Sequence, residues 1–171
     1  MSQDTNDVLD AADWRLLRQL QRDASLTNQE LAARCALSPA TCLRRVRRLH
    51  ALGLIERTVC VLNGQALYQH LGAGLTAIVE VTLDVQAEAQ QQAFAARAVA
   101  DVAVQQCYRT SPGADFVLIV TVADMPAFMA FSQRLFTQDA NVRNVRTFFS
   151  MQRYKFSAEL PLDDASGAAE N

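Results

Sequence analysis

The stretch SPATCLRRVRRLHALG, residues 38–53, decides the fold of the N-terminal part of this chain. It places arginine at positions 44, 45, 47 and 48, although the whole chain of 171 residues has a formal net charge of −2. Ser38 followed by Pro39 is a typical helix start, because the serine side chain can cap the first turn and proline lacks only an amide that has no helical partner. Gly53 is suited to the left-handed position after a last turn. The stretch therefore predicts a helix that begins at Pro39 and ends before Gly53.

The residues of this predicted helix separate into two faces when they are placed at about 100° per residue. One face is apolar and is expected to pack on a core; it carries Cys42, Leu43, Val46 and Leu49. The other face carries Ala40, Thr41, Arg44, Arg45, Arg47 and Arg48, and no acidic residue occurs anywhere in residues 38–53. A solvated face with surface ion pairs is the alternative interpretation, but such a face usually mixes both signs of charge. We interpret this one as a surface for an anionic partner.

Two shorter helices are predicted before it. Asp10 precedes an apolar pattern that indicates a helix over residues 11–23, and Thr27 with Glu30 forms a capping-box signature for the next helix. Three short helices with an arginine-rich third helix are typical of a helix-turn-helix, whose natural partner is double-stranded DNA. The predicted DNA-binding residues are Thr27, Asn28, Gln29, Ser38, Pro39, Ala40, Thr41, Arg44, Arg45, Arg47 and Arg48.

The rest of the chain predicts an alternation of strands and helices. Strands are expected over residues 55–63, 74–84, 102–110, 115–122 and 142–156, and helices over 87–99 and 124–136. From residue 74 onward the order is βαββαβ, a ferredoxin-like arrangement. Two helices cover one face of such a sheet, and because Ile78 and Tyr108 would lie on the other face, we expect a second subunit to cover it. The fold class is α+β: a winged helix-turn-helix domain at 8–60, a linker at 61–72, a ferredoxin-like domain at 73–157 and a flexible tail at 158–171.

Three ordered motifs resemble the leucine-responsive regulatory protein/AsnC family, the feast/famine transcription regulators. LSPATCLRRVRRLHALGLI (37–55) is similar to the family pattern L-S-x-x-x-x-x-x-R-[VI]-x-x-L-x-x-x-G-[VI]-I. LDAADWRLLRQLQRDA (9–24) resembles L-D-x-x-D-x-x-[IL]-L-x-x-L-x-x-[DN]-[AG], and LTNQELAARCALS resembles the second helix. The resemblance covers residues 8–157. It implies a regulator of amino-acid metabolism that binds a pseudo-palindromic operator as a homodimer, often assembled into tetramers or octamers.

The resemblance also implies that the second domain binds a small effector, usually an amino acid, near a subunit interface. The family turn [ST]-G-x-x-D matches residues 111–115 here, but Pro112 stands where glycine is usual, and proline fixes φ and removes an amide donor. Asp115 is a candidate anion for an effector ammonium group; its alternative role is that of a turn residue with local bonds. The full set of expected effector residues is Arg109, Thr110, Ser111, Pro112, Gly113, Ala114, Asp115, Met125, Phe148 and Ser150. For Phe148, a core position is an equally open interpretation.

Composition narrows the remaining functions. The chain has neither a long apolar run nor a signal-like N-terminus, so we expect a cytoplasmic protein with no membrane partner. Its four cysteines have no C-x-x-C spacing, which favours reduced thiols over a metal site, and no cofactor is expected. Two alternatives to a DNA-binding regulator stay open: a tetrapyrrole decarboxylase-like enzyme with the same domain plan, and an effector-binding protein that never contacts DNA.

Overall fold

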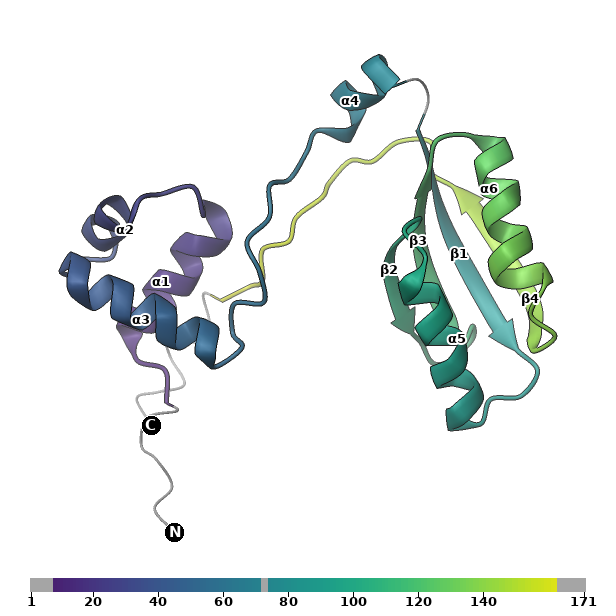
Figure 1. Cartoon of the computed structure of the whole chain (residues 1–171), viewed down its shortest axis with the longest axis horizontal. Helices are drawn as coiled ribbons and strands as arrows, with labels where there is room; N and C mark the ends of the chain where they lie inside the picture. The colour runs from purple at the N-terminus through teal and green to yellow at the C-terminus, as the bar shows by residue number, and fades with distance from the viewer. Residues whose placement is uncertain (1–7, 72–73, 163–171) are drawn as a thin grey trace, which may run out of the picture. The chain divides into compact units, whose positions relative to one another are not determined.

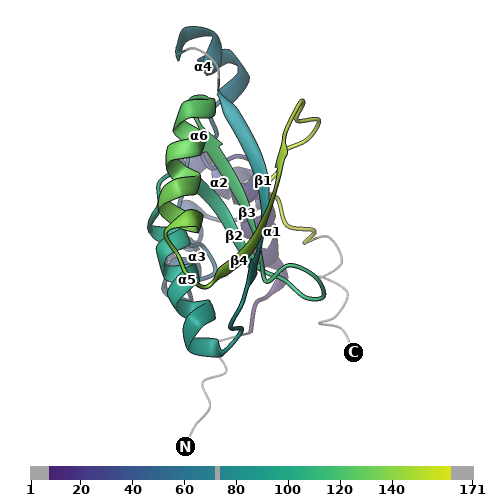
Figure 2. The same cartoon turned by 90° about the vertical axis from the view of Figure 1, so that its right-hand side faces the viewer.

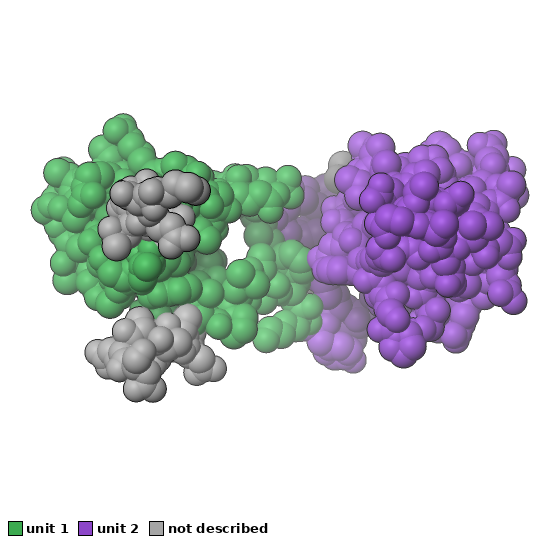
Figure 3. All heavy atoms as spheres, turned by 90° about the horizontal axis from the view of Figure 1, so that it is seen from below, with its two compact units in different colours: residues 1–61, 155–171 green, residues 62–154 purple. Residues whose placement is uncertain are grey.

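Three short helices form the N-terminal unit: α1 (Ala11–Arg22), α2 (Asn28–Arg34) and α3 (Pro39–Ala51) (Figure 1). The computed structural model describes residues 8–71 and 74–162. The chain divides into two units, residues 1–61 with 155–171, and residues 62–154, which Figure 3 shows in two colours. Each unit is described by itself below.

The predicted caps of these helices are confirmed. Asp10 caps α1 and Thr27 caps α2, each in a reciprocal capping box with the residue three positions on. Ser38 accepts a hydrogen bond from the amide of Thr41, and Pro39 is the first residue of α3. Gly53 has φ +70, the left-handed conformation expected after the last turn. Local side-chain chemistry therefore sets the limits of all three helices.

The core of the N-terminal unit is small and lies between the three helices. Its fully or nearly fully buried apolar residues are Leu16, Leu31, Ala32, Cys35, Cys42 and Leu49. The prediction placed Leu43 in this core, and that was wrong: its side chain is 42% exposed. Leu43 lies at the edge of the apolar arc of α3, where the neighbouring helices do not reach it.

The segment after α3 differs from the prediction. Residues 55–63 were expected to form a strand, but they have no regular secondary structure, and Val59 and Val61 are exposed. β-Branched residues favour a strand only where a partner strand accepts its hydrogen bonds, and in the described part of the chain none pairs with this segment. The predicted linker instead contains a helix, α4 (Gly64–Leu71), whose start is capped by Asn63. Residues 72 and 73 of the linker region lie outside the described residues.

The second unit is built on a four-stranded antiparallel sheet, as the βαββαβ prediction required. Its strands are β1 (Leu75–Leu83), β2 (Val104–Arg109), β3 (Phe116–Val122) and β4 (Val142–Phe149), in the order β2-β3-β1-β4. β1 pairs with β3 from Leu75↔Val122 to Val81↔Phe116, and on its other edge it pairs with β4 through Ile78↔Phe148. The most apolar strand, β3, is central, as its sequence predicts.

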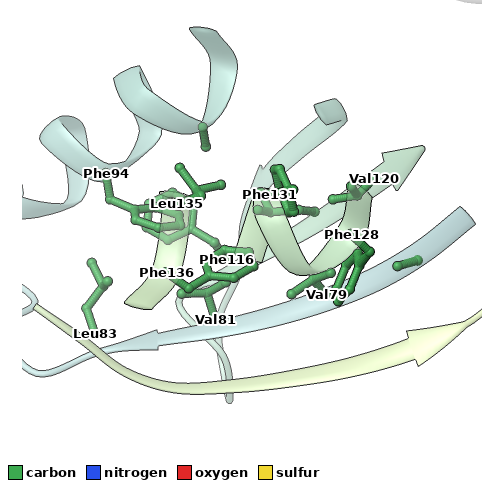
Figure 4. Packing of buried hydrophobic residues seen from close by; sticks show 13 residues of the cluster. Val79, Val81, Leu83, Phe94, Phe116, Val120, Phe128, Phe131, Leu135 and Phe136 are labelled. Carbon is green, nitrogen blue, oxygen red and sulfur yellow. The ribbon is translucent and has the colours of Figure 1, made fainter. Parts of the chain in front are cut away.

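Both long helices of this unit cover one face of the sheet (Figure 2). They are α5 (Glu88–Ala100) and α6 (Met125–Ser132), the latter continuing as a π-helical turn over Gln133–Thr137. Alternate residues of β1 and β3 point toward these helices and meet a layer of phenylalanines (Figure 4). Phe94 packs on Phe116 with ring centroids 4.9 Å apart, and Phe131 packs edge-on against Phe136 at 5.4 Å.

The opposite face of the sheet carries apolar side chains that no element among the described residues of this unit covers. Ile78 is 40% exposed, Tyr108 53% and Phe148 46%. We call these three residues, together with their cross-strand neighbour Ile119, the open sheet face. They lie on the face where the sequence predicts a second subunit.

The C-terminal segment makes contacts with α1. The side-chain amide of Gln21 donates to the carbonyl of Leu160 at 3.0 Å and accepts from its amide at 3.0 Å. Arg18 donates to the carbonyl of Leu162, and Arg22 forms an ion pair with Glu159. Residues 159–162 therefore lie against α1, which the expectation of a flexible tail at 158–171 did not include. Residues 163–171 lie outside the described residues.

Candidate nucleic-acid interface and effector site

The four arginines of α3 occupy two different environments. Arg44 and Arg47 are exposed, and neither makes an ion pair or a side-chain hydrogen bond to another described residue. Arg45 and Arg48 are largely buried, with side chains 19% and 22% exposed. The prediction treated all four as one uncompensated cationic face, and for Arg45 and Arg48 that was wrong.

The compensating charge comes from the start of α1. Asp13 is 0% exposed, and its two carboxylate oxygens accept separate hydrogen bonds: Oδ1 from Arg45 at 2.8 Å and Oδ2 from Arg48 at 3.0 Å. Arg45 also pairs with Asp10, at 2.9 and 2.8 Å, and Arg48 donates to the carbonyl of Val8 at 3.2 Å. We call Asp10, Asp13, Arg45 and Arg48 the α1–α3 clamp. It joins two helices that are about thirty residues apart in the sequence.

The clamp shifts the ionisation of its exposed carboxylate. Burial disfavours the charged form of Asp10, but the hydrogen bonds from Arg45 and from the amides of Asp13 and Ala12 outweigh it and hold the pKa of Asp10 below its ordinary value. The hydrogen bonds that Arg45 donates to Asp10 and Asp13 raise the pKa of Arg45. Both groups therefore stay ionised across the physiological range.

The other predicted DNA-binding residues are divided between internal contacts and the surface. Thr27 is occupied by its capping box, and the Asn28 side chain donates to the carbonyl of Pro39 at 2.9 Å, which ties the start of α2 to the start of α3. The hydroxyl of Ser38 caps α3 and donates to that of Thr41 at 2.8 Å. The remaining side chains of the set, Gln29, Pro39 and Ala40, are exposed.

Sequence reasoning missed Asp10 and Asp13 as partners of the α3 arginines. The signal for Asp13 was present: it lies three, four and seven positions before Leu16, Leu17 and Leu20, on the apolar side of α1. A charged residue on such a stripe requires a buried partner of opposite charge. Arginine on the facing helix is the obvious candidate.

The first group of predicted effector residues lies in the hairpin between β2 and β3. Asp115 is 8% exposed, and its Oδ2 accepts from the amide of Leu83 at 2.7 Å and from the side chain of Gln86 at 3.2 Å. Thr110 donates through Oγ1 to the carbonyl of Ala114 at 2.6 Å, and Arg109 forms an exposed ion pair with Glu88 at 3.0 Å.

The turn between them consists of Ser111, Pro112 and Gly113, all exposed, with a cis peptide bond before Pro112 and φ +112 at Gly113. The Asp115 side chain thus has structural contacts, but they reach Leu83 and Gln86 at the end of β1 and are not the local turn bonds of its alternative role.

The second group lies toward the other end of the sheet. Met125 is the first residue of α6, directly after β3, and Ser150 donates its amide to the carbonyl of Thr76 at the start of β1. Phe148 lies on the open sheet face with Arg146 stacked 5.4 Å from its ring centre. Strand β3 has 7 residues, so Asp115 and Met125, which flank it, are separated by about 20 Å within one chain, whereas Phe148 lies opposite Ile78 in the middle of the sheet. The structure therefore does not bring all ten residues together in one chain.

Other kinds of site receive little support from the described residues. No helix there is long and apolar enough to cross a membrane, and no group of three or more His, Cys, Asp or Glu side chains is placed to hold a metal ion. All four cysteines are free, and burial raises the pKa of the Cys35, Cys42 and Cys107 thiols. A hollow of about 240 Å³ lies between α1 and the C-terminal segment, and none of the predicted effector residues lines it.

Comparison with known families covers both units. The model for winged helix-turn-helix DNA-binding domains matches residues 9–56, and the model for the Lrp/AsnC ligand binding domain matches residues 76–160. The leucine-responsive regulatory protein of Rhizobium meliloti is 36% identical over 154 residues, which are 90% of this chain and 96% of that protein. The chain belongs to the Lrp/AsnC family. It is thus a DNA-binding transcriptional regulator with a ligand-binding domain, and the hypothesis of a decarboxylase-like enzyme is set aside.

Further members of the family are similar to this chain over almost its whole length. The leucine-responsive regulatory protein of Escherichia coli K12 is 33% identical over 152 residues, covering 89% of this chain and 90% of that protein. A transcriptional regulator from Neisseria meningitidis, solved as a complex with L-Met, is 30% identical and superposes with a TM-score of 0.80, covering 91% and 98% of the two chains. An AsnC family regulator from Agrobacterium tumefaciens gives the same identity, coverage and TM-score.

Proposed function

We propose that this protein is a sequence-specific regulator of amino-acid metabolism whose binding to a pseudo-palindromic operator is controlled by a small effector, an amino acid. The observation that carries the DNA-binding part is the outer face of α3, where Arg44 and Arg47 are exposed without an acidic partner among the described residues. Guanidinium groups on an exposed helix can contact phosphates and read guanine edges in the major groove. The protein acts in the cytoplasm.

The amino-acid effector is supported by the relative from Neisseria meningitidis that was solved with L-Met. A zwitterion needs an anion for its ammonium group and donors for its carboxylate. The β2–β3 hairpin offers a donor at Ser111, whereas the hydroxyl of Thr110 already donates to the carbonyl of Ala114. Asp115 is the nearby anion, although Leu83 and Gln86 already donate to it. A single amino acid cannot contact both Asp115 and Met125 in one chain, because these residues flank β3 and are about 20 Å apart. Met125 and Ser150 can join the hairpin only if a second copy supplies them.

The proposed assembly is a homodimer that associates further into tetramers or octamers. The open sheet face supports it, since Ile78, Tyr108 and Phe148 are exposed there and form an apolar surface that a second copy can cover. A dimer also presents α3 twice, as a pseudo-palindromic operator requires.

An electrophoretic mobility shift on the DNA upstream of the chain's own gene tests DNA binding. We expect the affinity for this duplex to fall steeply as salt increases, because each phosphate contact releases condensed counterions. An effector-binding protein that never contacts DNA is the alternative, and the absence of a salt-dependent shift would favour it.

A thermal-shift screen of the twenty amino acids, L-Met first, tests the effector. A bound amino acid should raise the melting temperature of the C-terminal unit. Without ligand, replacing Asp115 by Ala should lower this melting temperature, because a buried hydrogen-bond acceptor is lost. The corresponding loss of unfolding free energy is about 1–3 kcal/mol. Gln86→Ala is the matched control, since it removes one donor to Asp115 and leaves the carboxylate. An Asp115→Ala variant with an unchanged ligand titration would restrict Asp115 to its structural role.

A further inference from the structure

The outer side of α3 carries a stripe of four residues, of which the sequence predicted all but Leu43 to face outward. Ala40, Leu43, Arg44 and Arg47 follow the spacing i, i+3, i+4, i+7, so they lie on one face of the helix, and all four are exposed. Leu43 is 42% exposed although it is apolar. We call these four residues the reading stripe. The clamp residues Arg45 and Arg48 lie about 100° farther round the same helix.

We infer that α3 reads DNA through Leu43, Arg44 and Arg47, and that Arg45 and Arg48 are positioning residues that hold α3 on Asp10 and Asp13. The inference rests on the proposed DNA-binding function and divides its arginines into two kinds. It also adds Leu43 to the residues that contact DNA, and it assigns Asp10 and Asp13 to holding α3 in the folded unit.

The burial of Asp13 keeps Arg45 and Arg48 away from phosphate. Each oxygen of this carboxylate has one arginine donor, and the side chain is 0% exposed. If either arginine turned to the DNA, a desolvated carboxylate would lose half of its compensation. A single phosphate contact at the surface stabilises the arginine much less than its ion pair with Asp13 does, because the contact forms in water and is screened by salt. The clamp is therefore retained when DNA binds.

The reading stripe has the chemistry for particular base edges. The guanidinium groups of Arg44 and Arg47 can each bind O6 and N7 of guanine, and the isobutyl group of Leu43 can contact the 5-methyl group of thymine. Ala40 is small and lies at the N-terminal end of the stripe, which lets the helix approach the base pairs closely. The expected half-site therefore contains guanine beside thymine.

The two kinds of arginine can be separated with a duplex selected from a randomised pool by the full-length protein. Arg44→Gln and Arg47→Gln should each weaken binding by roughly 5- to 150-fold, the loss of one bidentate base contact, with an unchanged melting temperature. Arg57→Gln is the matched control, since Arg57 is exposed and lies outside α3. This substitution should reduce the affinity for DNA only slightly.

Lysine variants test the clamp, because lysine keeps the charge that a phosphate contact needs but cannot reproduce the forked geometry. Arg45→Lys and Arg48→Lys should lower the melting temperature of the N-terminal unit by roughly 5–10 °C. Measured well below that temperature, their affinity for DNA and its salt dependence should equal those of the wild type. If Arg45→Gln or Arg48→Gln reduces the salt slope by about 0.9 with no change in melting temperature, the residue contacts phosphate and the positioning role is overturned.

Leu43 is tested by replacing thymine with uracil in the selected duplex, which removes only the methyl group. The wild type should bind the uracil duplex more weakly, whereas Leu43→Ala should bind both duplexes equally. A Leu43→Ala variant that still distinguishes them would overturn the role of Leu43. If no duplex is selected at all, the proposed function fails and the reading stripe with it, whereas the melting temperatures of Arg45→Lys and Asp13→Asn still decide the clamp.

Discussion

Adjacent arginines in α3 differ because of what lies across from each one. Arg44 and Arg45 are neighbours in sequence and chemically identical, yet only Arg45 faces the carboxylates of Asp10 and Asp13. Summing charge over residues 38–53 could not distinguish them, since the acids that compensate lie in another helix. They could have been distinguished by noting that Asp13, on the apolar side of α1, needs a partner of opposite charge among the arginines of α3.

Asp10 makes the stability of the N-terminal unit sensitive to acid. Its pKa is below the ordinary value in the folded protein, so its contribution is complete above about pH 5 and is lost as the pH falls through the folded-state pKa. We expect the unfolding free energy of this unit to fall between about pH 5 and pH 2 less steeply in Asp10→Asn than in the wild type, since asparagine still caps α1. Urea unfolding followed by Trp14 fluorescence measures this.

The second unit supplies a control for this acid sensitivity. The hydrogen bonds from Gln92 and Arg109, with the charge of Arg109, lower the pKa of Glu88, so Glu88→Gln should alter the acid response of the second unit alone. Identical pH profiles for Asp10→Asn and the wild type would contradict the effect ascribed to Asp10.

At the scale of elements, helix ends were predictable because their causes are local. Thr27 with Glu30, and Ser38 with Pro39, each specify a start within a few residues. Residues 55–63 were not predictable in this way, since a strand forms only where a partner strand is present to pair with it. The helix α4 was missed because residues 61–72 were interpreted as a linker, whereas the Asn63 side chain caps a helix by accepting a hydrogen bond from the amide of Ala66.

Helices α2 and α3 end in the same hydrogen-bonding motif, but with different residues in its left-handed position. Each helix ends in a pair of hydrogen bonds characteristic of a Schellman motif: Leu37 to Ala32 and Ala36 to Ala33 after α2, Leu54 to Leu49 and Gly53 to His50 after α3. The left-handed position is Gly53 with φ +70 in α3 but Ala36 with φ 53 in α2. An alanine in this conformation is strained and a glycine is not.

Exchanging these residues should change stability in opposite directions. Gly53→Ala should lower the unfolding free energy by about 1 kcal/mol, because no neighbouring atom lies within 4 Å of the added Cβ and only the backbone strain counts. Ala36→Gly should raise it by up to about 1 kcal/mol, the relief of strain less the entropy of a glycine in the unfolded chain. Thermal unfolding measures both. Destabilisation by Ala36→Gly as large as that by Gly53→Ala would show that strain at this position is negligible.

At the scale of the whole molecule, the distribution of effector residues could have been predicted from strand length. Asp115 and Met125 flank β3, so a seven-residue strand must place them at opposite ends of the sheet. The family resemblance assigned them to one site, because a sequence motif does not tell which subunit of an assembly contributes each residue. The fold was more predictable than the site, since alternation of apolar residues determines the faces of a sheet locally.

The C-terminal segment contributes to the stability of a unit that is distant from it in sequence. Its bonds to Arg18, Gln21 and Arg22 attach residues 159–162 to α1. Deletion of residues 158–171 should therefore lower the unfolding free energy of the N-terminal unit by about 1–2 kcal/mol and leave the second unit unchanged. Calorimetry that resolves the two transitions measures this, with Gln21→Ala as a variant that removes only the paired amide bonds. A shift of the second transition alone would contradict these contacts.

The open sheet face decides how many copies act together. Ile78 lies on the strand between β3 and β4, and its neighbours across the sheet are Ile119 and Phe148. If a second copy covers this face, Ile78→Lys buries an unpaired ammonium group at the interface. The desolvation of this charge should prevent the dimer from forming. The monomer itself should stay folded, because the side chain is 40% exposed in a single chain. We expect sedimentation equilibrium to give a monomer for this variant and a dimer or larger assembly for the wild type.

The matched control is Val99→Lys on the helix layer, where the side chain is 70% exposed and lies on α5 rather than on the open sheet face. This variant should keep the dimer, because the new ammonium group stays in water. A dimer of Ile78→Lys as stable as that of Val99→Lys would move the interface away from the sheet. The separation of the two groups of effector residues gives this result a second meaning: a monomeric Ile78→Lys variant that still binds an amino acid with wild-type affinity would locate the effector within one chain, at a single end of the sheet.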